Sequence, residues 1–117
     1  MNAKPDMPAL IDGKTRLFGI IGHPIEQVKS PELLTANFRA RGRNAIMLPL
    51  HILPEKFDET IRGLIALKNL DGLIATVPYK LRLMEYMDRV HPSGKRIGAV
   101  NAARREKDGT WSGDMFD

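Results

Sequence analysis

Four short polar segments of this sequence carry side chains that could bind and act on a small ligand. They are residues 22–31, 72–80, 97–101 and 112–117. Each segment adjoins an apolar run of strand length or a turn. In an open α/β sheet, such segments gather at the carboxyl ends of the strands. We therefore expect the four segments to meet at one edge of a sheet and to form one binding site.

Lys80 is the residue of these segments best suited to proton transfer. It follows Pro78 and Tyr79 and falls in the first turn of an expected helix. The helix dipole and the free amide groups of that turn disfavour a cation, so a lysine placed there gives up its proton more readily. Taken alone, a surface lysine is the simpler interpretation of Lys80, just as a solvated carboxylate is for Asp117.

Three apolar runs predict the strands that position these segments, at residues 16–21, 45–52 and 73–77. After Arg16 the first run contains no polar side chain, which is typical of a strand covered on both faces. Pro49 cannot donate a ladder hydrogen bond, so the second run is expected at the edge of the sheet. Asp71 and Gly72, just before the third run, predict a turn.

A helical pattern follows each of these strands. Ser30, with Pro31 and Glu32 behind it, predicts a helix that begins with the serine as its cap and ends at Gly42. The next two helices are expected to begin near residues 54 and 78. Their apolar faces comprise Phe57, Ile61, Leu64 and Ile65 in the first, and Leu83, Met84, Met87 and Val90 in the second.

This order of elements predicts an α/β fold, with an open, twisted, mainly parallel sheet in three layers, flanked by helices. Residues 99–105 and 110–113 flank the turn sequence Lys107-Asp108-Gly109, which predicts a C-terminal antiparallel hairpin. Residues 1–14 are expected to be a flexible leader. Residues 15–117 suit one domain, since about 100 to 150 residues form a workable single core.

Composition excludes several classes of protein. An apolar content of 43% with 27% charged residues is typical of a folded domain and not of a disordered chain. The absence of cysteine favours a reducing, cytoplasmic location, and no apolar run is long enough to predict a membrane segment. The net charge of +4 is spread over helix ends and turns, so no nucleic-acid partner is expected. The three histidines are not spaced as metal ligands.

The four segments together resemble the substrate-binding domain of the shikimate/quinate dehydrogenase family. The family pattern reads approximately G-x-P-I-x-H-S-x-S-P, N-V-T-x-P-x-K, G-A-V-N-T and G-x-N-T-D-G. This chain reads GHPIEQVKSP, IATVPYK, GAVNA and SGDMFD at the corresponding places. The resemblance covers about residues 15–117, and it is specific because four separated motifs occur in the same order.

The resemblance implies a role for each matching residue. Lys80 corresponds to the catalytic lysine and Asp117 to the catalytic aspartate. Ser30 corresponds to a serine that binds the substrate carboxylate, Thr76 to a threonine that contacts a hydroxyl, and Asn101 to the asparagine that holds the ring hydroxyls. In this interpretation Lys80 takes the hydroxyl proton, while Asp117 bonds the same hydroxyl and orients the lysine.

Departures from the pattern make the expected pocket less polar. Gln27 and Val28 replace its H-S pair, so one of two carboxylate-binding serines is missing, and Ile74 replaces an asparagine. Ala102 and the pair Met115-Phe116 stand in place of polar residues as well. Loss of one hydrogen bond to a carboxylate weakens binding about ten- to hundredfold. We therefore expect the ligand to be either shikimate or quinate held differently, with Gln27 or Lys29 compensating, or a related hydroxylated ring acid that meets Val28 and Ile74.

The resemblance implies an NADP-dependent dehydrogenase that interconverts a ring alcohol and a ketone, with NAD as the alternative cofactor. No glycine-rich fingerprint opens a helix in these residues. A Rossmann domain outside this chain is therefore expected to bind NADP, either further along the polypeptide or as a separate subunit, and the chain alone is predicted to be inactive.

The expected partner is a small hydroxy acid, and a homodimer is left open. The rival hypothesis is a non-catalytic binding module or sensor for an aromatic-pathway metabolite; retention of Lys80 and Asp117 speaks against it.

Overall fold

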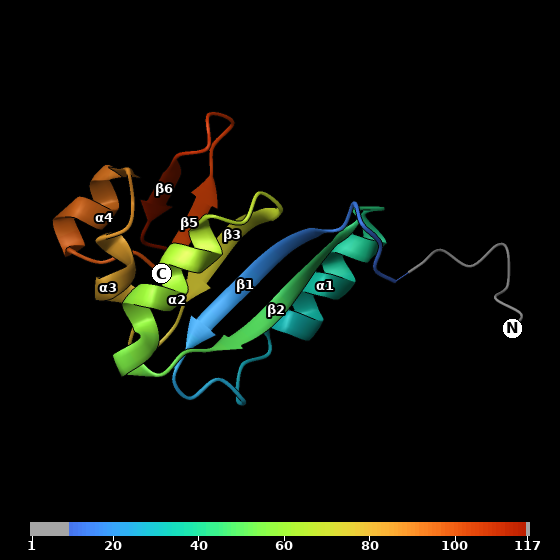
Figure 1. The fold of residues 1–117 in the computed structure, drawn as a ribbon, viewed down its shortest axis with the longest axis horizontal. Coiled ribbons are helices and arrows are strands. Elements are labelled where there is room, and N and C mark those ends of the chain that lie inside the picture. Colours follow the sequence, from blue (N-terminus) through green and yellow to red (C-terminus); the bar gives the residue numbers. More distant parts are fainter. Residues whose placement is uncertain (1–9, 117) are drawn as a thin grey trace, which may run out of the picture.

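The computed structural model describes residues 10–116, which form a mixed sheet with helices on both faces (Figure 1). The strands are β1 (Arg16–Gly22), β2 (Ala45–His51), β3 (Leu70–Ala75), β4 (Arg89–Val90), β5 (Ala102–Arg105) and β6 (Trp111–Asp114). The helices are α1 (Ser30–Ala40), the 3-10 turn η1 (Pro54–Lys56), α2 (Phe57–Ile65), α3 (Lys80–Met84) and α4 (Pro92–Ile97). The predicted α/β class is confirmed.

The strand order in the sheet is β2-β1-β3-β5-β6-β4. Strand β1 runs parallel to both β2 and β3, and β4 runs parallel to β6. Strand β5 is antiparallel to β3 and to β6, with Gly109 at a φ of 89° in the connecting turn. The mainly parallel sheet and the C-terminal hairpin are therefore confirmed, and β2 with its Pro49 lies at the edge as predicted.

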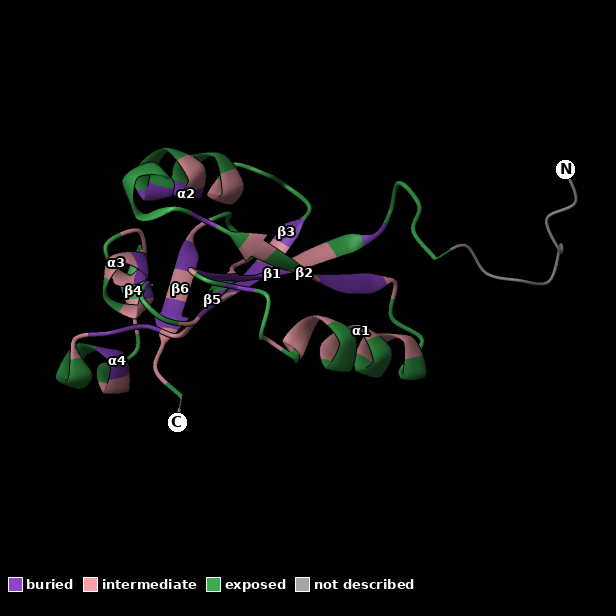
Figure 2. Ribbon diagram, turned by 90° about the horizontal axis from the view of Figure 1, so that it is seen from below, coloured by how far each residue is buried: buried purple, intermediate pink, exposed green. Residues whose placement is uncertain are grey.

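Two apolar clusters hold helices against opposite faces of the sheet, with α2 on one face and α1 on the other (Figure 2). Because successive side chains of a strand alternate between faces, Ile21 belongs to the first cluster and Ile20 to the second. The first cluster includes Phe57 and Ile61 of α2, both fully buried. Leu34 of α1 packs against the second.

The turn predicted at Asp71 and Gly72 is wrong, because both residues lie inside β3. The Asp71 carboxylate accepts two hydrogen bonds from Arg16 of β1, Nε to Oδ2 at 2.9 Å and Nη2 to Oδ1 at 2.6 Å. Gly72 pairs with Phe18, and a Cβ atom on Gly72 would lie only 2.9 Å from Phe18 Cδ2. Asp and Gly are typical of turns when judged from local sequence, but here the contacts of Asp71 and Gly72 with β1 explain their presence in a strand.

The helix predicted after residue 78 is shorter than expected, because α3 ends at Met84. Met87 lies beyond α3, and Val90 pairs with Gly113 in the short strand β4. Helix α4, which was not predicted from the sequence, follows; His91 is its N-cap, and Gly98 ends it at a φ of 78°. Of the apolar residues expected to end this helix, Val90 therefore belongs to the sheet and Met87 to the connection before it.

The two ends of α1 differ in how well they were predicted. Gly42 follows the helix with a φ of 72°, as the predicted end requires. At its start the N-cap is Lys29, without a capping side-chain hydrogen bond, so the prediction that Ser30 is the cap is wrong by one residue.

Most of the leader predicted at residues 1–14 lies outside the described residues. Across residues 10–116, no helix has the length and apolar character that crossing a membrane requires.

Candidate active site

The first two polar segments meet where β1 and β3 end. The Thr76 amide donates to the Ile21 carbonyl at 2.9 Å, and the His23 amide donates to the Val77 carbonyl at 3.1 Å. Gly22 lies between these bonds, and a Cβ atom there would lie 2.5 Å from Thr76 Cγ2. The Thr76 side chain therefore packs directly over the Gly22 backbone, at the edge where the sheet was expected to carry the site.

The third segment joins the second through two backbone hydrogen bonds. The Ala75 amide donates to the Asn101 carbonyl, and the Val100 amide donates to the Lys80 carbonyl, each at 2.9 Å. These bonds place the first residue of α3 beside the start of β5. The segments that carry Thr76, Lys80 and Asn101 are therefore brought together, as predicted from the order of the elements.

The fourth segment is held by Asn101. The Asn101 amide donates to the Asp114 carbonyl at 3.0 Å, and Asn101 Oδ1 accepts from the Phe116 amide at 2.8 Å. Asn101 Nδ2 donates in turn to the Phe116 carbonyl. The side-chain amide thus binds the backbone just before Asp117, a partner that sequence alone did not indicate. Asp117 itself lies outside the described residues.

Lys80 is half-buried at the start of α3. The residue before it, Tyr79, is fully buried, and its hydroxyl donates to the Ile52 carbonyl beyond β2. The backbone of Lys80 is therefore fixed from two directions, through Val100 and through Tyr79. In the part of the chain that the structure describes, the Lys80 ammonium group forms no ion pair.

The loop between β1 and α1 carries the other predicted contacts. Ser30 is half-buried as the first residue of α1. Gln27 is exposed, and its Nε2 donates to the Pro24 carbonyl at 3.0 Å, so its amide group closes the loop on itself. Val28 and Ile74 pack against the apolar cluster on the α1 face of the sheet. Val28, two residues before Ser30, thus ties this loop to the sheet.

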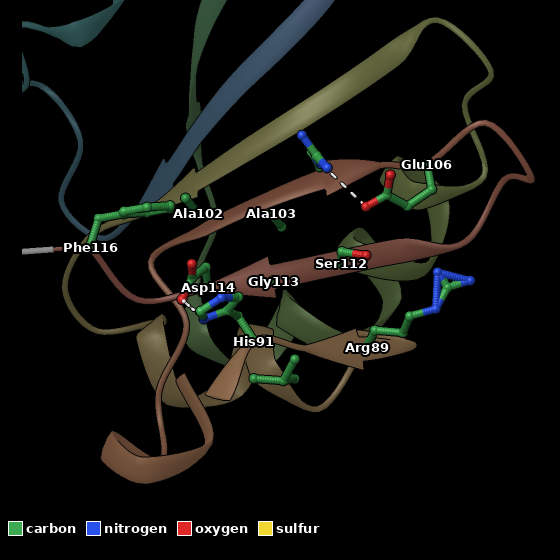
Figure 3. Close-up of a pocket in the computed structure, with 11 residues that line it drawn as sticks. Arg89, His91, Ala102, Ala103, Glu106, Ser112, Gly113, Asp114 and Phe116 are labelled. Atoms are coloured by element: carbon green, nitrogen blue, oxygen red, sulfur yellow. Dashed lines mark hydrogen bonds and ion pairs between the residues drawn. The ribbon is translucent and has the colours of Figure 1, made fainter. Parts of the chain in front are cut away.

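A cavity of about 500 Å³ lies next to this site, over the hairpin (Figure 3). Its lining includes Ala102 and Phe116 near one end, Asp114 and His91 turned toward each other, and Arg89 at the opposite end. Lys80, Ser30 and Thr76 do not line it. The cavity therefore adjoins the predicted site through Phe116 and Asp114 but does not contain Lys80, the lysine predicted to transfer the proton.

A small polar cluster at this cavity was not predicted from the sequence. The Ser93 hydroxyl donates to Asp114 Oδ1 at 2.5 Å, and His91 Nδ1 lies 3.5 Å from the same oxygen. The hydrogen bond from Ser93 holds the pKa of the Asp114 carboxyl below its usual range. No local pattern indicates this cluster, because it depends on the pairing of β4 with β6.

The described residues do not form a cradle for a metal or a dinucleotide. Within residues 10–116, no group of three or more His, Asp or Glu side chains is placed to hold a metal ion. The helices there begin at Ser30, Phe57, Lys80 and Pro92, and none opens on a glycine-rich loop of the kind that binds a pyrophosphate. What these residues offer is a pair of hydroxyls and an ammonium group, suited to a small polar ligand with an acidic group.

The fold and these joined segments define an α/β ligand-binding domain with its polar groups at the carboxyl edge of the sheet. The chain belongs to the family of shikimate dehydrogenase substrate binding domains, whose model matches residues 20–103. The resemblance inferred from the four motifs is thereby confirmed.

Similar proteins agree in sequence and in structure. The shikimate dehydrogenase (NADP(+)) of Anaeromyxobacter sp. (strain K) is 40% identical over 108 residues, which are 92% of this chain and 38% of that protein. That of Rubrobacter xylanophilus is 40% identical over 107 residues, 92% of this chain and 37% of the relative. This chain therefore spans well under half the length of these relatives.

Two crystal structures share the fold. Shikimate dehydrogenase from Aquifex aeolicus gives a TM-score of 0.83 at 36% identity, over 89% of this chain and 38% of that one. Shikimate 5-dehydrogenase from Listeria monocytogenes, in complex with shikimate and NAD, gives a TM-score of 0.85 at 28% identity, over 93% and 37% of the two chains.

Proposed function

We propose that this chain is the substrate-binding part of an NADP-dependent dehydrogenase that interconverts a ring alcohol and a ketone of a shikimate- or quinate-like hydroxy acid. The chain carries the catalytic lysine of that enzyme. Relatives that are named shikimate dehydrogenase (NADP(+)) support the activity and the cofactor, and the complex of one relative with shikimate supports the ligand class.

The observation that carries this proposal is the ladder of hydrogen bonds that joins the four motif segments. It runs from Ile21 to Thr76, from Lys80 to Val100, and from Asn101 to Asp114. A proton-transfer group works only within hydrogen-bond reach of the substrate hydroxyl, so it must be held in a fixed place. The ladder fixes the backbone of Lys80 beside the Thr76 and Asn101 segments.

In this proposal some residues of the chain bind the substrate and others transfer the proton. The Ser30 hydroxyl donates to the substrate carboxylate, and the Thr76 hydroxyl bonds a ring hydroxyl. Lys80 Nζ exchanges the proton of the reacting hydroxyl, and Asp117 bonds that hydroxyl and orients the lysine. Hydride acceptance belongs to the nicotinamide. Because the described residues lack a pyrophosphate cradle, we assign NADP to a domain other than this one, with NAD as the alternative.

Replacing Lys80 with alanine in the enzyme that carries this domain and its cofactor domain tests the assignment. We expect turnover of shikimate to fall about 10²- to 10⁴-fold, the usual contribution of a general acid or base, while ligand binding stays measurable. Steady-state kinetics and a shikimate titration measure the two effects. Lys95→Ala, at an exposed position of α4, is the matched control and should leave turnover unchanged. Near-normal turnover of Lys80→Ala would refute the role.

A non-catalytic binding module for the same ligand class is the second candidate. The aliphatic side chains of Val28 and Ile74 favour it, since fewer polar contacts remain to orient a reacting alcohol. The same kinetic experiment decides between the two candidates, because a binding module retains a dissociation constant for the acid but shows no NADP-dependent turnover before any mutation is made.

A further inference from the structure

Helix α3 takes its position from its contacts, because a helix of five residues is far too short to be stable alone. Lys80 is its first residue. Leu83 within α3 and Tyr79 just before it are fully buried, and they attach this part of the chain to the core. Val77 and Leu81 nearby are exposed. Of the two buried side chains only Tyr79 has a polar group, so it alone can add a directional hydrogen bond to the apolar packing.

The Tyr79 hydroxyl binds residues 52–58, which follow β2 and which we call the anchor segment. It donates to the Ile52 carbonyl. The Ile52 amide donates in turn to the carbonyl of Gly22, the last residue of β1, at 3.2 Å. Ile52, which has no role predicted from the sequence, therefore connects the end of β1 to the residue before Lys80.

Arg82 binds the anchor segment from outside the core. Its Nη1 donates to the Pro54 carbonyl at 2.9 Å. Its guanidinium carbon lies 4.4 Å from the centroid of the Phe57 ring, and the centroid of the Tyr79 ring lies 4.4 Å from the same point. Tyr79 and Arg82, on either side of Lys80 in the sequence, thus hold the start of α3 against one segment.

A proton-transfer group must stay within about 2.6–3.2 Å of the group whose proton it exchanges, and a displacement of about 1 Å can lower the rate about 10²-fold. We propose that Tyr79 is a positioning residue for the proton-transfer step. Through its hydrogen bond to the Ile52 carbonyl it holds Lys80 at a fixed place relative to the end of β1, and Arg82 supports the same placement from the surface. This inference rests on the proposed function and adds the residues that keep its lysine in reach of the substrate.

Tyr79→Phe tests the proposal in the enzyme that carries this domain and its cofactor domain. The change removes the hydroxyl and keeps the ring that packs on Phe57. We expect kcat for shikimate to fall about tenfold while KM changes by no more than about twofold, because the residues assigned to substrate binding stay in place. Tyr86→Phe is the matched control. Tyr86 is the other tyrosine of the chain, and its hydroxyl donates to Asp58 Oδ1 at 2.5 Å in the anchor segment, but it lies beyond α3, so kcat should be unchanged.

The same change in a Lys80→Ala background separates positioning from a purely structural role. Without the amine, nothing remains for the Tyr79 hydroxyl to position, so Tyr79→Phe should lower the residual turnover by no more than about twofold. A further loss of about tenfold in this background would show that the hydroxyl supports the whole site, and it would overturn the proposal.

The other outcomes distinguish this inference from the proposed function. If Tyr79→Phe keeps a normal kcat while Lys80→Ala loses turnover, the inference fails and the proposed function stands. If Lys80→Ala keeps near-normal turnover, both fail, because there is then no proton-transfer lysine to position. If Tyr79→Phe does not fold, Arg82→Met decides. It removes the bond to the Pro54 carbonyl from a half-buried side chain and should lower kcat without raising KM, and an unchanged kcat would overturn the proposal.

Discussion

Gly22 shows how a single residue can set the geometry of this site. The backbone bonds that flank it bring the ends of β1 and β3 together, and the side chain of Thr76 takes the space that a Cβ atom would fill. The same Cβ atom would also lie 3.2 Å from Ile25 Cδ1 and 3.3 Å from the Val77 carbonyl. A larger residue at Gly22 must therefore displace the threonine that we assign to the substrate.

Replacing Gly22 with alanine should lower the free energy of unfolding by about 1–3 kcal/mol, as other overpacked sites do. Gly63→Ala is the matched control: Gly63 lies within α2, nothing is within 4 Å of its Cβ position, and the change should raise stability by about 0.5–1 kcal/mol. Urea unfolding followed by circular dichroism measures both. Equal effects of the two substitutions would show that Thr76 does not pack as tightly as described.

Sequence predicted the types of the site residues better than it predicted their partners. Lys80 was identified from its place in the first turn of a helix and Thr76 from the resemblance to the family pattern, and the structure joins their segments as expected. The bonds between Asn101 and Phe116 were not predicted, nor was the bond between Ser93 and Asp114. Both depend on the register of strands that are distant in sequence, which no local spacing of residues fixes.

At the level of elements, an ion pair joins β1 to β3. Arg16 and Asp71 are 55 residues apart in sequence, and two hydrogen bonds connect their side chains. Arg16 also donates to the Lys68 carbonyl at 2.7 Å, just before β3. The hydrogen bonds from Arg16 lower the pKa of the Asp71 carboxyl from its usual value. The pair therefore stabilises the folded chain only while Asp71 is ionised.

This ion pair makes stability depend on pH in a predictable direction. Because the pKa of Asp71 is lowered in the folded state, its contribution is fully present above the unfolded pKa of about 3.9 and is lost as pH falls through the folded pKa. The unmodified chain should therefore be more stable than Asp71→Asn at pH 7, and the difference should close below about pH 4.

Urea unfolding of both proteins between pH 7 and pH 2.5 measures this closing difference. The control is the same comparison in an Arg16→Gln background, where the partner is missing and the pH dependence of the difference should largely disappear. A difference that persists unchanged at pH 2.5 would mean that the Asp71 carboxylate does not act through Arg16.

Elements were predictable where a single residue type imposes a constraint. Pro49 placed β2 at the sheet edge, and Gly42 and Gly109 marked the end of a helix and the tip of a hairpin. Prediction failed at β4, because Val90 fits a helical face equally well. Only its pairing with Gly113 removes it from the helix, and that pairing depends on β6 already being in the sheet.

For the molecule as a whole, the parallel half of the sheet and the hairpin half meet at the site. The β1–β3 pairing supplies Thr76 and the loop to Lys80, whereas β5 and β6 supply Asn101 and the chain that leads to Asp117. Asn101 ties the second half to the first, since its backbone carbonyl accepts from the Ala75 amide while its side-chain amide group binds the Phe116 backbone. Removal of that side chain should therefore loosen one half only.

Asn101→Ala tests this division by hydrogen exchange. We expect the Phe116 amide to lose its acceptor and to exchange hydrogen at least tenfold faster. In the variant, local opening no longer has to break the hydrogen bond to Asn101 Oδ1, so opening costs less free energy. The backbone amides that form the ladder between β1 and β2 should keep their protection from exchange, since that ladder does not involve the Asn101 side chain. Asn37→Ala, at an exposed position of α1, is the matched control. Equal acceleration in β1 would mean that the halves open together, and unchanged exchange at Phe116 would mean that Asn101 does not hold the chain there.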